Sequence, residues 1–74
     1  MVVKFEVYHD GEQWCARGVG ADIFTCAQTL DQLTEDVKDA AACHFADEVA
    51  AGKPLSVLLL TEAEVPGVAQ APAG

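Results

Sequence analysis

The chain has 74 residues, 51% of them hydrophobic, so it forms one small globular domain and is not a disordered acidic segment. Its twelve acidic residues outnumber four Lys and Arg, and the formal net charge of −8 excludes ordinary nucleic-acid binding and disfavours anionic membranes. The charge favours a basic protein partner, and the small size of the core favours self-association.

The N-terminal residues and the cysteines predict a cytoplasmic protein. Charged residues early in the chain interrupt the apolar region that a signal peptide requires. The longest apolar run, 57–60, is too short to span a bilayer. Cys15, Cys26 and Cys43 are odd in number and lack CxxC spacing, as expected for free thiols in a reducing compartment.

The first structural signal is a β-hairpin. Apolar and polar residues alternate over 3–8 and again over 14–19, as in half-buried strands. Asp10-Gly11 lies between them and is typical of a two-residue type I′ turn. The pairs predicted from that turn are His9–Glu12, Val7–Trp14 and Phe5–Ala16. One face then gathers Val3, Phe5, Val7, Trp14 and Ala16.

A third short strand is expected from Ile23 to Ala27, after a turn at Gly20-Ala21-Asp22. The length of this loop decides whether Ile23 or Phe24 faces the core, because a slip of one residue reverses the two faces of a strand. Both alternatives remain open from the sequence.

A helix is expected next, from Leu30 to Ala50. Thr29 and Gln32 match a capping box at its start, and Gly52 and Pro54 end it. Apolar residues recur at helical spacing and predict the buried side, and acidic residues decorate the outside. The buried set is Leu30, Leu33, Val37, Ala40, Ala41 and Phe45, and the acidic set is Asp31, Glu35, Asp36, Asp39 and Asp47.

The apolar run 55–60 predicts a final strand buried on both faces. The fold class is therefore α+β with the order βββαβ. A four-stranded mixed sheet has one helix on one face, and its last strand lies beside the first and parallel to it. Residues 1–64 form this single domain, and 65–74 form a flexible tail rich in Pro, Gly and Ala.

The other face of this sheet has no second helix to cover it. An apolar sheet face must be buried against something, so we expect that face, or a sheet edge, to contact another chain. The candidate interface residues are Tyr8, Cys15, Phe24, Leu58 and Leu60.

The segments 5–11, 14–20 and 23–25, followed by 29–33 and by Ala40-Ala41 and His44-Phe45, resemble the short HicB-like antitoxin-related proteins. The resemblance covers about residues 3–60 and implies a partial ribonuclease-H-like fold without ribonuclease activity, and self-association. In full-length members this domain binds HicA, a small basic mRNA-cleaving toxin, and a separate C-terminal domain binds operator DNA. This chain has Gly20-Ala21-Asp22 where many members have Pro-Gly-Cys, and it ends without a DNA-binding motif, so we expect no direct DNA or RNA binding.

No set of residues predicts catalysis, a cofactor or a metal. His9 beside Asp10 lacks convergent ligands, and Asp10 is explained by turn geometry. Cys43 and His44 are helix neighbours that do not face each other, which argues against a nucleophile–base pair. Glu6 lies in a strand and the acids Asp10 and Asp22 lie in turns, which does not suit a two-metal nuclease. We therefore expect a protein that is not an enzyme.

Three functions follow from these observations. The first is a non-catalytic protein-binding module that occludes a small basic toxin, with the acidic helix face either merely solvated or presented to that partner. The second is a solitary homo-oligomer, a dimer or larger, with a regulatory or scaffolding role. The third, ranked below these, is a small-molecule binder that uses a crevice between subunits.

Overall fold

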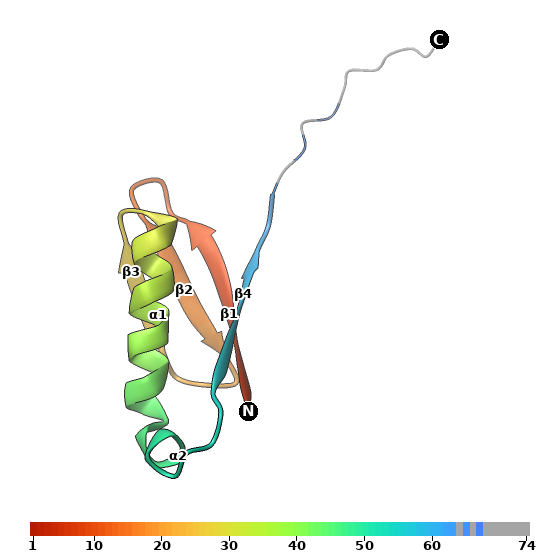
Figure 1. Ribbon diagram of the computed structural model, residues 1–74. Coiled ribbons are helices and arrows are strands. Elements are labelled where there is room, and N and C mark those ends of the chain that lie inside the picture. Colours follow the sequence, from red (N-terminus) through yellow and green to blue (C-terminus); the bar gives the residue numbers. More distant parts are fainter. Residues whose placement is uncertain (64, 66, 68–74) are drawn as a thin grey trace.

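The computed structural model describes residues 1–63, 65 and 67, and it contains a four-stranded sheet with a long helix across one face (Figure 1). The strands are β1 (Val2–His9), β2 (Trp14–Val19), β3 (Phe24–Ala27) and β4 (Ser56–Thr61), and the helices are α1 (Leu30–His44) and α2 (Ala46–Ala50). The sheet order is β3-β2-β1-β4, with β1 antiparallel to β2 and parallel to β4. The α+β class and the mixed sheet are confirmed. Of the predicted tail at 65–74, position 66 and positions 68–74 lie outside the described residues.

The hairpin of β1 and β2 forms, but its register differs from the prediction. The observed pairs are His9–Trp14, Val7–Ala16 and Phe5–Gly18, so the three predicted pairs are wrong. Each partner is displaced by two residues. Because side chains alternate with a period of two, the predicted set still lies on one face of the sheet.

The longer loop has a cause in the side chain of Asp10. Its carboxylate accepts hydrogen bonds from the backbone N–H groups of Glu12 and Gln13, both at 2.9 Å. Gly11 follows with φ of 102°, a conformation that favours glycine. These bonds hold a loop from Asp10 to Gln13, which a type I′ turn at Asp10-Gly11 would not contain.

The turn before β3 settles which residue faces the core. The backbone N–H of Gly18 donates to the carbonyl of Ile23 at 2.8 Å, and the N–H of Ile23 donates to the carbonyl of Ala21 at 3.0 Å. Ile23 is buried in the core, whereas Phe24 is 60% exposed on the other face. Of the two open alternatives, the structure therefore has Ile23 inside.

The start of α1 follows the predicted cap in part. The Thr29 hydroxyl accepts from the backbone N–H of Gln32 at 3.1 Å. The Gln32 side chain donates to Asp36 at 2.8 Å instead of returning to Thr29, so the reciprocal bond of a capping box is not made. Leu30, predicted to be buried, is 41% exposed because it lies in the first turn, beyond the edge of the core.

The predicted single helix is divided at Phe45. Its φ of −109° and ψ of 40° end α1, and α2 begins at the next residue. The Phe45 ring packs against the core and makes an edge contact with His44, with centroids 4.8 Å apart. Gly52, with φ of 78°, then ends α2 and turns the chain toward β4. Packing of one aromatic side chain explains the break that helical periodicity alone did not reveal.

The core lies between α1 and one face of the sheet. It consists of Val3, Phe5, Val7, Ala16, Ile23, Ala27, Leu33, Val37 and Ala41, with Trp14 partly buried at its border. The predicted burial of β4 on both faces is wrong. Val57 and Leu59 face the core, but Leu58 and Leu60 are exposed, because within the described residues no element lies over the opposite face.

Candidate protein-interaction site

The face of the sheet opposite α1, here called the open face, carries an unusual amount of exposed apolar surface. The strand registers place on it Val2, Lys4, Glu6 and Tyr8 of β1, Cys15, Arg17 and Val19 of β2, Phe24 and Cys26 of β3, and Ser56, Leu58 and Leu60 of β4. Six large hydrophobic residues on it are exposed, and they come from all four strands: Val2, Tyr8, Val19, Phe24, Leu58 and Leu60. The registers place Lys4, Glu6 and Arg17 between these apolar side chains. Several exposed large apolar residues on one face mark an interaction site more often than a solvated face does.

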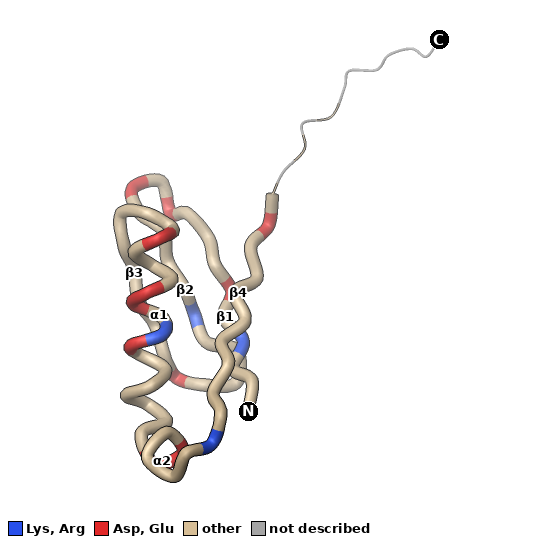
Figure 2. Tube along the Cα trace, in the orientation of Figure 1, with Lys and Arg blue, Asp and Glu red and all other residues tan. Residues whose placement is uncertain are grey.

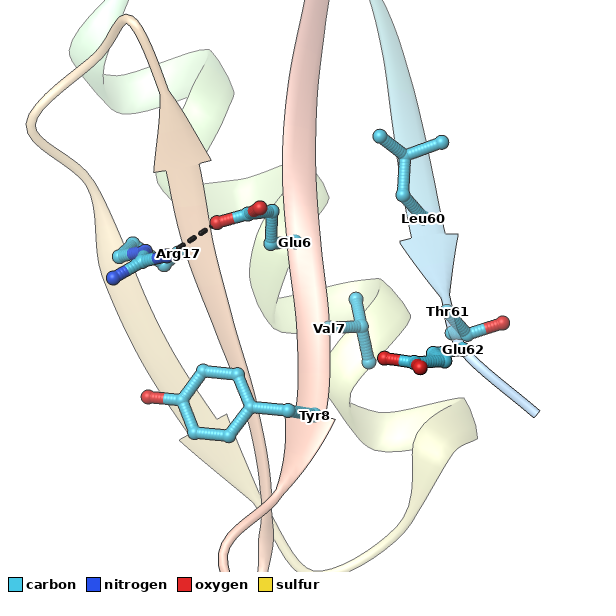
Figure 3. A pocket seen from close by; sticks show the side chains of 7 residues that line it. All are labelled: Glu6, Val7, Tyr8, Arg17, Leu60, Thr61 and Glu62. Atoms are coloured by element: carbon cyan, nitrogen blue, oxygen red, sulfur yellow. Dashed lines mark hydrogen bonds and ion pairs between the residues drawn. The ribbon is translucent and has the colours of Figure 1, made fainter. Parts of the chain in front are cut away.

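A shallow hollow lies on this face between β1 and β4, with a volume of about 360 Å³. Glu6 and Arg17 form an ion pair beside it, with Tyr8 on one side and Leu60 on the other (Figure 3). Both charged side chains are more than half exposed, so the pair adds little to stability. The pair instead places both signs of charge between the apolar side chains of the open face.

Cys15 occupies the open face without being accessible. It is 2% exposed, and its thiol lies 2.9 Å from the thiol of Cys26, the residue directly opposite on β3. The hydrogen bond that the two thiols share, together with burial, raises the pKa of Cys15 to about 11. Burial and the neighbouring Cys15 also raise the pKa of Tyr8. Both groups are therefore neutral at physiological pH.

The opposite side of the molecule is acidic. Asp31, Glu35 and Asp39 recur every four residues along α1 and are all exposed, and Figure 2 shows acidic positions along this helix. Lys38 forms an ion pair with Glu35 at 3.0 Å, so the row of Asp31, Glu35 and Asp39, here called the acidic ridge, still has a net negative charge. The protein thus has two distinct surfaces, an apolar sheet face and an acidic helix face.

A second hollow lies beside the helices, because α1 packs chiefly against β3 and β2 and leaves the core side of β4 partly uncovered. It has a volume of about 420 Å³ and is lined by Lys38, Ala42, Val49, Lys53, Leu55 and Val57. This hollow was not predicted from the sequence, since its lining depends on where α1 crosses the sheet.

All five predicted interface residues lie on the open face. Tyr8, Phe24, Leu58 and Leu60 are exposed there, and Cys15 lies beneath the surface. The prediction omitted Val2 and Val19, although the alternation along β1 and β2 contained the signal for both. It also omitted the Glu6–Arg17 pair, which only the register brings together.

Two polar residues of the hairpin loop, His9 and Asp10, accept backbone hydrogen bonds that shape the loop. Asp10 closes the hairpin loop, and His9 accepts from the N–H of Gly11 at 3.1 Å. In the part of the chain that the structure describes, no three His, Cys, Asp or Glu side chains gather to hold a metal ion. Neither helix within residues 1–63 has the length and apolar character needed to cross a bilayer.

The chain is similar to a UPF0150 protein of Archaeoglobus fulgidus, with 46% identity over 43 residues. The matched segment covers 58% of this chain and 65% of the relative, so it spans somewhat less than two thirds of that protein. The name of that relative states no activity. No family model and no solved structure matches the chain.

Proposed function

We propose that this protein is a non-catalytic protein-binding module that self-associates through the open face and neutralises a small basic partner by covering it. The observation that carries the proposal is the set of six exposed apolar side chains on one face of the sheet. Each such side chain contributes stability only when it is removed from water, and a second protein surface supplies that burial.

A second copy of the chain suits the open face. The face is apolar, as in homodimer interfaces, and tyrosine and phenylalanine are enriched in such surfaces. It also carries Lys4 and Arg17 together with Glu6, so two copies related by a two-fold axis can match opposite charges. A strongly basic partner would find little negative charge on this face.

The acidic ridge of α1 suits the basic partner. It lies on the far side of the molecule from the open face, so self-association leaves it exposed. Acidic complementarity accelerates encounter with a basic protein and makes the association weaken with salt. The resemblance to HicB-like antitoxins suggests the class of partner, a small basic mRNA-cleaving toxin of the HicA type, in the cytoplasm.

Co-expression tests the proposal. A small basic HicA-like protein encoded beside this gene is expected to arrest growth alone, and the chain is expected to relieve the arrest and to co-purify with its partner. The double variant E35Q/D39N on α1 is expected to weaken this binding. The matched control E12Q/D22N removes the same charge from two turns and is expected to bind as the wild type does.

A toxin that stays fully active and fails to co-purify would refute neutralisation. Equal losses in the two double variants would show that net charge, and not the acidic ridge, drives binding. The absence of any small basic neighbouring gene would favour the second function, a solitary homo-oligomer with a regulatory or scaffolding role, because the open face would then have only copies of itself to bind.

A further inference from the structure

The thiols of Cys15 and Cys26 face each other across two neighbouring strands. They lie directly opposite each other on neighbouring antiparallel strands, β2 and β3. The Cys26 thiol donates to the Cys15 sulfur at 2.9 Å, so the two side chains point toward each other. Cys43 lies apart from them, exposed on α1.

The ladder geometry favours a covalent link at this position. Gly18 donates its N–H to the carbonyl of Ile23, which makes that pair hydrogen-bonded. Hydrogen-bonded and non-hydrogen-bonded pairs alternate along an antiparallel ladder. The Cys15–Cys26 pair lies three positions along the ladder from the Gly18–Ile23 pair, so it is a non-hydrogen-bonded pair. The Cα atoms of such a pair are about 4.5 Å apart, which falls at the lower end of the 4.4–6.8 Å that disulfides span.

We propose that Cys15 and Cys26 are a redox-active pair that forms an intramolecular cross-strand disulfide by reacting with a low-molecular-weight disulfide of the glutathione type. The site follows from the strand register and from the partial exposure of Cys26 on the open face, so the reaction takes place on a copy of the chain whose open face is uncovered.

The order of events follows from accessibility. Cys26 is only partly buried, whereas Cys15 is 2% exposed. The Cys26 thiolate attacks one sulfur of oxidised glutathione, the glutathione S–S bond breaks, and one glutathione leaves as a thiol after taking a proton. Cys15 then loses its proton to water and attacks the Cys26 sulfur, and the second glutathione leaves. Two protein thiols are oxidised and one glutathione disulfide is reduced to two glutathione molecules.

The raised pKa of Cys15 agrees with this order. A thiol with a pKa of about 11 is almost entirely protonated at neutral pH and is a poor first nucleophile. Once Cys26 carries glutathione, the hydrogen bond between the two thiols is gone, and that bond is the largest cause of the raised pKa of Cys15; burial and the Asp10 carboxylate still raise it. Cys15 is then better able to resolve the mixed disulfide.

The test uses the full chain with Cys43 replaced by alanine, incubated folded with excess oxidised glutathione. Trypsin separates the two cysteines, because cleavage after Arg17 and Lys38 places Cys15 in 5–17 and Cys26 in 18–38. We expect C43A to lose the mass of two hydrogen atoms, to keep no glutathione and to yield these two peptides joined. Closing this short loop is also expected to raise the melting temperature by on the order of 10 °C.

Two further variants separate the steps. C15S/C43A is expected to retain one glutathione on Cys26, because the resolving thiol is missing. C26S/C43A is expected to remain unmodified while folded, because Cys15 is buried. The proposal is overturned if C43A accumulates the same glutathione adduct as C15S/C43A, or if it keeps two free thiols under conditions that modify C15S/C43A.

Discussion

Replacing Leu58 with glutamine tests whether the open face mediates self-association. Leu58 lies on β4 and is 43% exposed, so a second copy that covers the open face can bury the rest of its surface. Complete burial of a leucine side chain contributes about 1.5–3 kcal/mol, so the exposed part corresponds to about 1 kcal/mol. A two-fold symmetric dimer contains this contact twice. L58Q is therefore expected to weaken dimerisation by about 2 kcal/mol, or roughly 30-fold in Kd.

Leu30 provides a matched control. It is 41% exposed, nearly the same as Leu58, but it lies on α1 on the other side of the sheet. L30Q makes the same chemical change at the same exposure and is expected to alter Kd by no more than roughly twofold. Sedimentation velocity over a concentration series gives Kd for each variant, and urea unfolding checks that both remain folded.

Two results would refute the reasoning. The first is a wild-type chain that stays monomeric up to submillimolar concentration, which would leave the open face without the proposed second copy. The second is an equal effect of L58Q and L30Q, which would mean that exposed leucine in general, and not the open face, drives association.

Three further predictions concern the fold itself. G18A is expected to lower the free energy of unfolding by about 1–3 kcal/mol, because an added Cβ would lie 2.6 Å from the carbonyl oxygen of Ala21; unchanged urea unfolding would contradict this close approach. T29A is expected to cost about 1 kcal/mol by removing the α1 cap, whereas the control T34A, which removes a mid-helix hydroxyl, is expected to cost little, so equal losses would argue against the cap. The N–H donors of Gln13 and Glu12 lower the pKa of Asp10 below 3.8, so its ionised form stabilises the fold above that pH, and this contribution is lost as pH falls through the native pKa. D10N is therefore expected to be less stable than wild type at neutral pH, and the difference is expected to close in acid; a difference independent of pH in urea unfolding would contradict this.

The alternation along β1 and β2 correctly predicted which side chains share a face, because a strand's period of two is a local property of the chain. It did not predict the hairpin register. That register depends on the Asp10 carboxylate, which captures two backbone N–H groups and lengthens the loop. The dipeptide rule for the turn contains Asp10 but does not specify which backbone N–H groups its carboxylate binds.

The candidate site was likewise predicted from the sequence only in part. The missing second helix indicated an uncovered sheet face, and Tyr8, Phe24, Leu58 and Leu60 were assigned to it from the sequence. Burial of Cys15 and its contact with Cys26 were not predicted, because the residue opposite Cys15 on β3 is set by the turn that places Ile23 in the core.

By itself, the sequence determined the order of the strands and the main helix, the two faces of β1 and β2 and the excess of acid, since periodicity and composition are properties of short segments. Only the tertiary structure decided the strand registers, the break at Phe45 and the pairing of two distant thiols. These depend on specific hydrogen bonds, such as those that Asp10 accepts within its loop, and on packing between elements, neither of which the pattern of a single segment contains.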